Sequence, residues 1–269
     1  MDILIHTFSG IAAGTVISSF SKRGFLNKTS IILLGGLGGA FPDLDALSMY
    51  SKFDSTIGHA LHLNHAGKDI YFSKFWYSHH AFLHSILGGL TVALILALIY
   101  YLFKSKFRNL NFKSFAQKSY SYRLTFMAFF IGFFIHLLED MPTPSCTWGG
   151  VNLFFPGSSY IGGTGDIWWW NNYDLFLIIF TVIVLNIILL SLSRVLKLSA
   201  FKLTPIVFLI GMTFMVFQIK TRDFDFNYIG FSPRYNEFEA KSKQIQKKIL
   251  GDKVYRFMEK LDAKIPLNF

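Results

Sequence analysis

Histidine and aspartate residues stand beside the apolar segments of this chain, and some of them have the spacing of metal ligands. The sequence HLLED places His136 and Asp140 four residues apart, which puts both side chains on one face of a helix, about one turn apart. An imidazole and a carboxylate in this arrangement are a suitable pair of metal ligands. In the sequence SHHAFLHS, His80 and His84 share a helical face. His79 and His84 converge only if His79 precedes the helix or the helix is distorted.

Two further groups complete the pattern. His6 lies at the start of the first apolar segment, and Asp43 and Asp45 end the second one in the sequence PDLD. Ionisable groups at such depth need a partner or a metal. Each residue alone is more typical of a hydrogen bond at a helix end or of a turn than of a metal site, so the metal site is predicted from the whole group. A set of nitrogen and oxygen ligands suits zinc, manganese or iron.

The segments that position these residues are long and apolar. Of the 269 residues, 52% are hydrophobic and 16% are charged, against about 25% charged in an average soluble domain. The alternative, a buried bundle in one large soluble domain, is disfavoured because charge-free runs of this length are rare in soluble proteins. We therefore expect an all-α polytopic membrane helix bundle of about four to six membrane segments, drawn from residues 3–20, 29–42, 85–103, 124–138, 175–193 and 204–219.

Basic residues are distributed unevenly between the connecting segments. Residues 104–123 carry lysine and arginine without any acid, and residues 140–173 carry neither lysine nor arginine. By the positive-inside rule, 104–123 faces the cytoplasm and 140–173 lies outside. Because successive segments cross the membrane in opposite directions, the His and Asp groups are all predicted to lie at the outer, non-cytoplasmic face. The remaining inner turns contain the basic residues Lys22, Arg23, Lys28, Arg194, Lys197 and Lys202.

The composition of the chain changes from apolar to lysine-rich after the last apolar segment. We therefore divide the chain into a membrane-embedded domain at 1–220 and a basic tail at 221–269. From Tyr235 to Ile265, apolar residues recur near helical spacing among many lysines. This pattern predicts an amphipathic helix, with Gly251 as a break. Such a helix either lies on a lipid surface or packs on the outer loops of its own protein.

The order of these motifs resembles a family of bacterial membrane-bound, metal-dependent hydrolases, the LexA-binding inner-membrane-associated hydrolases. That family has an N-terminal histidine, a PD-[IL]-D turn, an H-R-G-x-T-H-S segment and an H-[IL]-x-x-D-x-x-T-P segment. This chain offers His6, PDLD at 42–45, HHAFLHS at 79–85 and HLLEDMPTP at 136–144. The resemblance covers about residues 1–175 and implies a location in the bacterial inner membrane.

The resemblance also implies which histidines bind metal. The outer pair His79 and His84 is kept, whereas His80 stands where arginine is usual, with Ala81 for glycine and Leu83 for threonine. His80 is therefore a candidate for substrate binding. The metal ligands implied are His6, Asp43, Asp45, His79, His84, His136 and Asp140.

The family is in turn similar, in its ligand pattern, to the zinc-dependent phospholipase C and P1-nuclease group of all-α phosphoesterases. Members of that group hold several metals with His and Asp ligands from helix ends. The similarity implies a site that activates a water and stabilises the charge developing on a phosphoester oxygen. In such a site Asp45 would bridge metals or act as the catalytic base.

The loop before the fifth apolar segment holds further candidates for substrate contact. It is dense in glycine, proline and aromatic residues and ends in WWWNNYD. One interpretation is an interfacial aromatic belt. The other is a lid over the metal site, in which Trp170, Asn171 and Asn172 touch the substrate. The absence of lysine and arginine from this loop argues against nucleic acid.

The predicted function is hydrolysis of an ester or phosphoester bond at the outer membrane face by a divalent metal. The expected partners are membrane lipid and a lipid or lipid-linked substrate. Two alternatives stay open. One is a non-catalytic membrane protein that acts through a protein partner. The other is a metal transporter, although ligands grouped at helix ends on one side of the membrane argue against a transport path.

Overall fold

The structure is a computed structural model of the chain, in which residues 3–108, 110–193 and 199–264 are described. Within these ranges every regular element is a helix and no β-strand is present, which confirms the predicted all-α class. Three residues used in the sequence analysis lie outside the described ranges, namely Arg194, Lys197 and Ile265.

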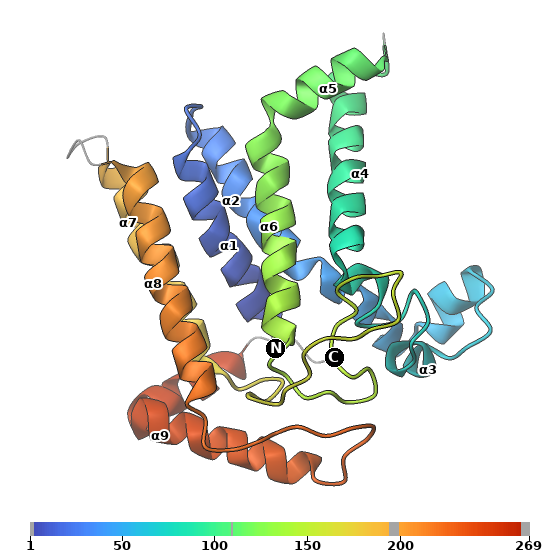
Figure 1. Cartoon of the computed structure of the whole chain (residues 1–269), viewed down its shortest axis with the longest axis vertical. Coiled ribbons are helices and arrows are strands. Elements are labelled where there is room, and N and C mark those ends of the chain that lie inside the picture. Colours follow the sequence, from blue (N-terminus) through green and yellow to red (C-terminus); the bar gives the residue numbers. More distant parts are fainter. Residues whose placement is uncertain (1–2, 109, 194–198, 265–269) are drawn as a thin grey trace.

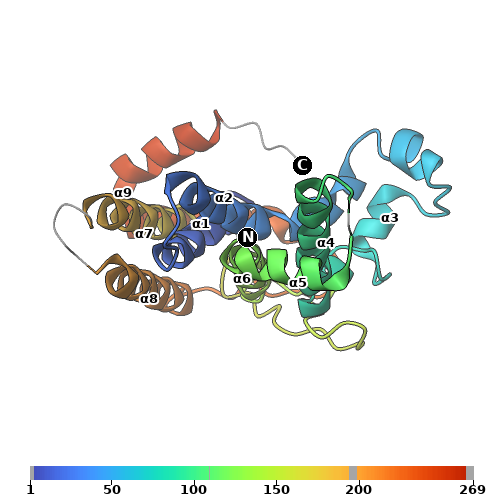
Figure 2. The same ribbon diagram turned by 90° about the horizontal axis from the view of Figure 1, so that it is seen from above.

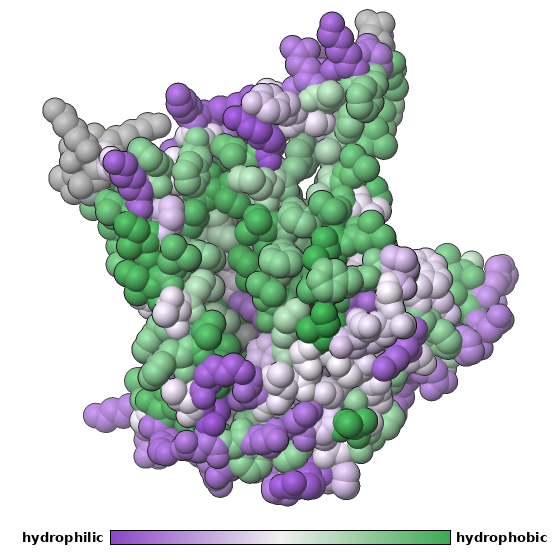
Figure 3. All heavy atoms as spheres, in the orientation of Figure 1, coloured by the Kyte–Doolittle hydropathy of each residue, from purple (hydrophilic) through white to green (hydrophobic). Residues whose placement is uncertain are grey.

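Three helices are long and apolar enough to cross a membrane on their own: α4 (Ile86–Lys104), α7 (Tyr173–Leu192) and α8 (Ala200–Lys220). Each contains a charge-poor run, which as a helix reaches across about 30 Å of hydrocarbon. Their apolar side chains face outward over much of their length. On the face seen in Figure 3, hydrophobic residues accordingly form a band across the middle of the molecule, with hydrophilic residues above and below it. The predicted membrane bundle is thus confirmed.

Two bent helix pairs raise the number of candidate spans to five. The first pair joins α2 (Phe25–Ala40) to the short 3-10 helix η1 (Pro42–Met49) at an angle of 46°. The second joins α5 (Phe112–Ser121) to α6 (Arg123–Asp140) at 72°. A sixth apolar helix, α1 (Ile3–Ser19), is shorter. The six predicted segments therefore all form helices, and length and composition support three to five of these as spans.

Glycine allows α1, α2 and α6 to pack with their backbones almost in contact. A Cβ atom on Gly10 would lie 2.2 Å from the carbonyl oxygen of Gly35, and one on Gly132 would lie 2.1 Å from the same oxygen. A Cβ atom on Gly39 would lie 2.1 Å from the carbonyl oxygen of His6. Small residues at such crossings let membrane helices approach closely. This glycine contact brings the start of α1 against the ends of α2 and α6.

The helix ends that carry the His and Asp groups lie at one end of the bundle. The start of α1, the end of α2, the start of α4 and the end of α6 all lie at the lower end in Figure 1, whereas α5 lies at the upper end. Seen from above, α1, α2 and α6 form the centre, with α4 on one side and α7 and α8 on the other (Figure 2). The short elements of the connecting segment at the lower end are η2 (Asp54–Gly58), α3 (Gly67–Phe72) and η3 (Phe82–His84).

The tail forms α9 (Tyr235–Asp262), with a non-helical break at Gly251, whose φ is 73°. The helix and its break both agree with the sequence pattern. The first half of α9 packs Phe238 against Trp168 and Phe226, so it covers the loop that precedes α7. The division of the chain into domains at residue 220 stays a prediction.

Candidate metal centre

The lower ends of four helical elements converge on one buried group of histidine and aspartate side chains. Local structure explains how two of these segments place their histidine and aspartate side chains. Pro42 opens η1 and turns the chain away from α2, so that Asp43 and Asp45 follow at once. Ser85 caps α4 by accepting a hydrogen bond from the Gly88 amide over 2.9 Å, which leaves the histidines before it in a turn.

Asp140 lies at the centre of this group. Its Oδ1 atom is 3.2 Å from Nε2 of His6. Its Oδ2 atom is 3.0 Å from Nε2 of His136, 3.5 Å from Nε2 of His84 and 3.9 Å from Nε2 of His80. All five side chains are buried. The structure therefore brings together residues from α1, from the segment before α4 and from α6.

Two of these histidines are oriented by backbone carbonyl groups. Nδ1 of His136 donates to the carbonyl oxygen of Gly39 over 2.7 Å, and Nδ1 of His80 donates to that of Gly150 over 2.9 Å. A carbonyl oxygen only accepts hydrogen bonds, so the proton must be on Nδ1. Nε2, which carries the lone pair of the neutral ring, then points into the cluster. Hydrogen bonding through the other ring nitrogen is typical of metal-binding histidines.

Carboxylates orient the other histidines in the same way. Nδ1 of His6 lies 2.8 Å from Oε2 of Glu139. Asp45 holds two rings, because its Oδ1 is 2.6 Å from Nδ1 of His79 and its Oδ2 is 3.0 Å from Nδ1 of His84. Both oxygens of Asp45 thus face ring nitrogens, as in the carboxylate–histidine pairs that surround metal sites.

One contact tests whether these residues fit a cation. Nε2 of His84 and Nε2 of His136 are 3.2 Å apart. Since Nδ1 of each ring donates to Asp45 or Gly39, two lone pairs face each other when both rings are neutral, with the Asp140 carboxylate beside them. Such an arrangement needs a positive charge, either a bound cation or added protons. The donor set of imidazole nitrogens and carboxylate oxygens fits a divalent transition metal.

Three combinations of residues have ligand atoms within 4.8 Å of one another, and two residues, His84 and His136, each belong to two of them. His84 and His136 share one combination with Asp43, which connects the other two. Burial lowers the pKa of His79 to about 4 and that of His80 to about 3, so both rings are neutral near pH 7. Neutral imidazole is the form that binds metal. The other two combinations are His79, His80 and His84, and His6, His136 and Asp140.

Aromatic side chains pack against His79 and His80, on the side of the segment that connects η1 to α4. The ring of Tyr71 stacks on His79, with centroids 4.5 Å apart and an interplanar angle of 12°. Trp148 lies 4.5 Å from His80 between ring centroids, and its Nε1 donates to the carbonyl oxygen of Tyr71 over 2.9 Å. Trp169 is further away, 6.3 Å from His80. These contacts were not predicted, since nothing in the sequence pairs Tyr71 with Trp148.

Asp43 is the most exposed carboxylate of the cluster, with 16% of its side chain accessible, against 4% for Asp45 and Asp140. Its neighbours on η1, Leu44 and Leu47, are 54% and 50% exposed. The accessible edge of the cluster therefore lies next to an exposed apolar surface.

Of the predicted substrate-binding residues, His80 belongs to this cluster, whereas the three in the loop before α7 make other contacts. Asn171 donates from Nδ2 to Glu239 on α9 over 2.7 Å, and Asn172 donates to the carbonyl oxygen of Trp168 over 3.0 Å. Trp170 is partly exposed beside Tyr235. Asn171 and Trp170 thus contact the tail helix, which follows much later in the sequence, and Asn172 bonds within its own loop.

A helix bundle with three to five candidate membrane spans and a buried His/Asp cluster defines an integral membrane protein with a candidate metal centre. The chain matches the family described as YdjM inner membrane protein over residues 1–223 and belongs to it. This family is the LexA-binding, inner-membrane-associated group that the sequence motifs resemble. The chain is accordingly a protein of the inner membrane. No curated protein and no solved structure gives a significant match.

Proposed function

We propose that the chain is a membrane-bound, metal-dependent hydrolase of ester or phosphoester bonds. The observation that carries this proposal is the convergence of imidazole Nε2 atoms on Asp140, with His84 and His136 only 3.2 Å apart between their Nε2 atoms. Each of these rings is held through Nδ1, so the lone pairs are fixed before any ligand arrives. Preorganised ligands of this kind are what a catalytic metal site requires.

His6, His84, His136 and Asp140 would hold the cation, with Asp43 at the accessible edge and His79 and His80 beside His84. Zinc, manganese or iron fits this donor set. When bound, such a cation lowers the pKa of a water molecule and stabilises negative charge on the oxygen of an ester.

Asp45 has a role that follows from its contacts. It orients His79 and His84 and keeps their protons on Nδ1, which leaves both Nε2 atoms available. Asp45 therefore acts in this proposal as a positioning residue. Its direct binding to metal, or its action as the base, stays a prediction. Asp43, with its accessible side chain, is placed to meet the substrate or a water molecule.

The substrate in this proposal is a lipid or a lipid-linked phosphoester. The cluster lies at the end of the helix bundle, where the hydrophobic band of Figure 3 gives way to hydrophilic surface, so it is near the level of lipid headgroups. Leu44 and Leu47 offer an apolar surface beside Asp43 for the hydrocarbon part of such a substrate. The proposal puts the cluster at the outer face of the membrane, because by the positive-inside rule the basic residues at the opposite end favour the cytoplasmic side.

The test combines metal analysis with an assay on the purified full chain. A variant with His136→Ala and Asp140→Ala removes two central ligands, and a control with His59→Ala and Asp223→Ala makes the same changes at exposed positions. We expect stoichiometric transition metal and hydrolysis of phospholipid or of simple phosphoesters in the wild type and the control, and neither in the ligand variant.

Other outcomes decide against the proposal. Bound metal without hydrolysis of any ester or phosphoester would favour action through a protein partner. Metal uptake into proteoliposomes that depends on His136 and Asp140 would indicate a transporter. Equal metal content in the ligand variant and the control would remove the cluster as the metal site.

A further inference from the structure

The second half of α9, residues 252–262, presents three kinds of surface around one helix. This part of the chain lies beyond the residues that match the family, which end at 223. Successive residues of a helix are about 100° apart, so residues spaced by three and four form stripes along it. The buried stripe consists of Tyr255 and Met258, and the partly buried Asp262 continues it. Two exposed stripes follow in turn around the helix, the first beside the buried stripe and the second beyond it, and they differ in chemistry.

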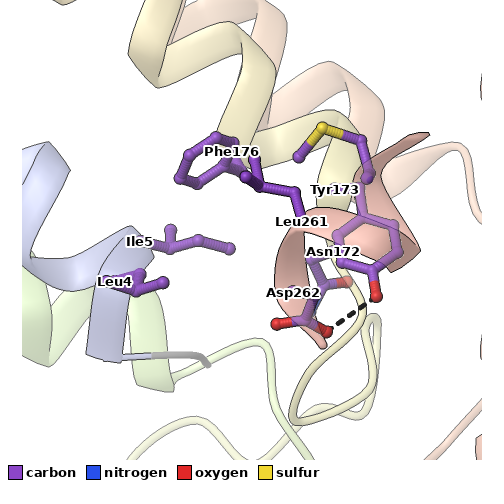
Figure 4. Close-up of a pocket in the computed structure, with 8 residues that line it drawn as sticks. Leu4, Ile5, Asn172, Tyr173, Phe176, Leu261 and Asp262 are labelled. Atoms are coloured by element: carbon purple, nitrogen blue, oxygen red, sulfur yellow. Dashed lines mark hydrogen bonds between the residues drawn. The ribbon is translucent and has the colours of Figure 1, made fainter. Parts of the chain in front are cut away.

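The buried stripe fixes the helix at the membrane boundary. Tyr255 and Met258 form a small core with Tyr173, the first residue of the candidate span α7. The hydroxyl of Tyr173 donates to Oδ2 of Asp262 over 2.8 Å, as Figure 4 shows. Because α7 begins at Tyr173, the second half of α9 lies where the span enters the polar layer of the membrane.

The next stripe is apolar and exposed. Val254, Phe257 and Leu261 follow the spacing i, i+3, i+7, and Phe257 is 65% exposed. Exposure of these side chains to water is unfavourable, because transfer of apolar surface out of water is favourable. The apolar surface continues inward, because Leu261 borders a hollow that is also lined by Leu4, Ile5 and Phe176 (Figure 4).

The third stripe is basic. Lys253, Arg256 and Lys260 are all exposed and also follow i, i+3, i+7, one residue before the apolar stripe. The acids Asp252 and Glu259 lie on the other side of the helix, away from the apolar stripe. With the buried stripe against α7, the apolar and acidic sides face opposite ways. If the apolar side enters the membrane, the acids face water and the basic stripe lies at the level of the lipid phosphates.

We propose that residues 252–262 form an interfacial helix that rests in the headgroup layer of the membrane and binds anionic phospholipid. Val254, Phe257 and Leu261 enter the acyl boundary, and the basic stripe contacts lipid phosphate groups. The lipid-facing surface of the bundle continues into this helix, since Phe176 beside the hollow stacks on the exposed ring of Phe180. This proposal is independent of the metal chemistry.

The test uses the full chain in lipid vesicles, with the buried Cys146 replaced by serine and one cysteine added for a polarity-sensitive fluorophore. Phe257→Cys reports on the apolar stripe, and Glu259→Cys, two residues away on the acidic side, is the matched control. The vesicles contain phosphatidylcholine alone or with added phosphatidylglycerol. Quenchers are lipids with a nitroxide near the headgroup, and iodide in the water.

We expect the probe at position 257 to show blue-shifted emission and quenching by the nitroxide lipids, and the probe at 259 to be quenched by iodide. Phosphatidylglycerol should increase the lipid quenching at 257. Changing Lys253, Arg256 and Lys260 together to glutamine should abolish that increase. Equal iodide quenching at 257 and 259 would overturn the proposal. Shielding of position 257 from both quenchers would also overturn it, because a protein partner or a second copy would then cover the stripe.

Discussion

The Oδ1 atom of Asp45 lies 2.6 Å from Nδ1 of His79, and this contact ties η1 to the segment before α4. The other oxygen of the same carboxylate lies 3.0 Å from Nδ1 of His84. One acid therefore keeps the ring proton of two histidines of the cluster on Nδ1. The identity of this residue as an acid, and not only its size, matters for the site.

Asp45→Asn tests that role. Asparagine keeps the shape of the side chain but has one oxygen and one amino group, so it accepts from only one of the two Nδ1–H groups. The other ring must turn or move its proton to Nε2. Changes around metal ligands cost about 10–100-fold in affinity, so we expect metal binding weaker by about this factor. Competition with a chelator of known affinity measures it, with the exposed Asp69→Asn as control.

The same variant separates the positioning role of Asp45 from a role as the catalytic base. A base that does not orient ligands would leave metal affinity unchanged when replaced by asparagine and would affect only hydrolysis. Full metal affinity together with lost hydrolysis would therefore contradict the positioning role and favour the base.

The glycine contact between α1 and α2 gives a second prediction. Gly39→Ala places a Cβ atom 2.1 Å from the carbonyl oxygen of His6, so the two helices must separate. Overpacking of this kind costs about 1–3 kcal/mol. The shift also moves the carbonyl of Gly39 that orients His136. We expect both a lower thermal midpoint in detergent and weaker metal binding.

Gly24→Ala is the matched control for that measurement, since a Cβ atom there meets nothing within 4 Å and its φ of −65° suits alanine. Equal midpoints and equal metal affinity for the two alanine variants would show that the close contact does not position the site.

A buried ion pair attaches the tail to the bundle and gives a third prediction. Nη2 of Arg222 is 2.8 Å from Oδ2 of Asp174, and both side chains are 4% exposed. Gln246 of α9 donates to Oδ1 of Asp174 over 2.9 Å. Arg222→Ala leaves a buried carboxylate without its cation, which costs about 3–5 kcal/mol. We expect faster cleavage of the tail by protease.

The contrasting variant is Lys248→Ala, which breaks an ion pair with Asp223 in which the two side chains are 78% and 79% exposed. Exposed pairs contribute little, so this change should leave cleavage of the tail unaltered. Equal protection in the Arg222 and Lys248 variants would show that the buried pair does not hold α9.

The apolar segments could be predicted from the sequence because a long run without charge has few structures open to it besides a membrane helix. The same holds for His136 and Asp140, whose spacing of four residues on one helix fixes their proximity. The tail helix followed from the spacing of its apolar residues, and its break from Gly251. In each of these cases the information is local in the chain.

Several groups that orient the histidines lie far from them in the sequence and could not be predicted. Glu139 stands next to Asp140, but its contact with His6 spans 133 residues of sequence. The acceptors of His136 and His80 are backbone carbonyls, which every residue has and no motif marks. The contacts of Asn171 with Glu239 likewise depend on how the tail folds back.

Removal of the metal gives the last prediction. The proposed ligands come from α1, η1, the segment before α4 and α6, so one cation would connect elements that are far apart in the sequence. Without it, the lone pairs of His84 and His136 face each other at 3.2 Å beside the Asp140 carboxylate. A ligand that binds only the folded state at 100 times its Kd stabilises by about 2.7 kcal/mol. We therefore expect a strong chelator to lower the thermal midpoint of the wild-type protein, and addition of zinc or manganese to restore it.

The variant with His136→Ala and Asp140→Ala should have a lower midpoint that the chelator does not change further. A wild-type midpoint that stays constant while elemental analysis shows that the metal has left would mean that the cluster is held together by protons and hydrogen bonds alone.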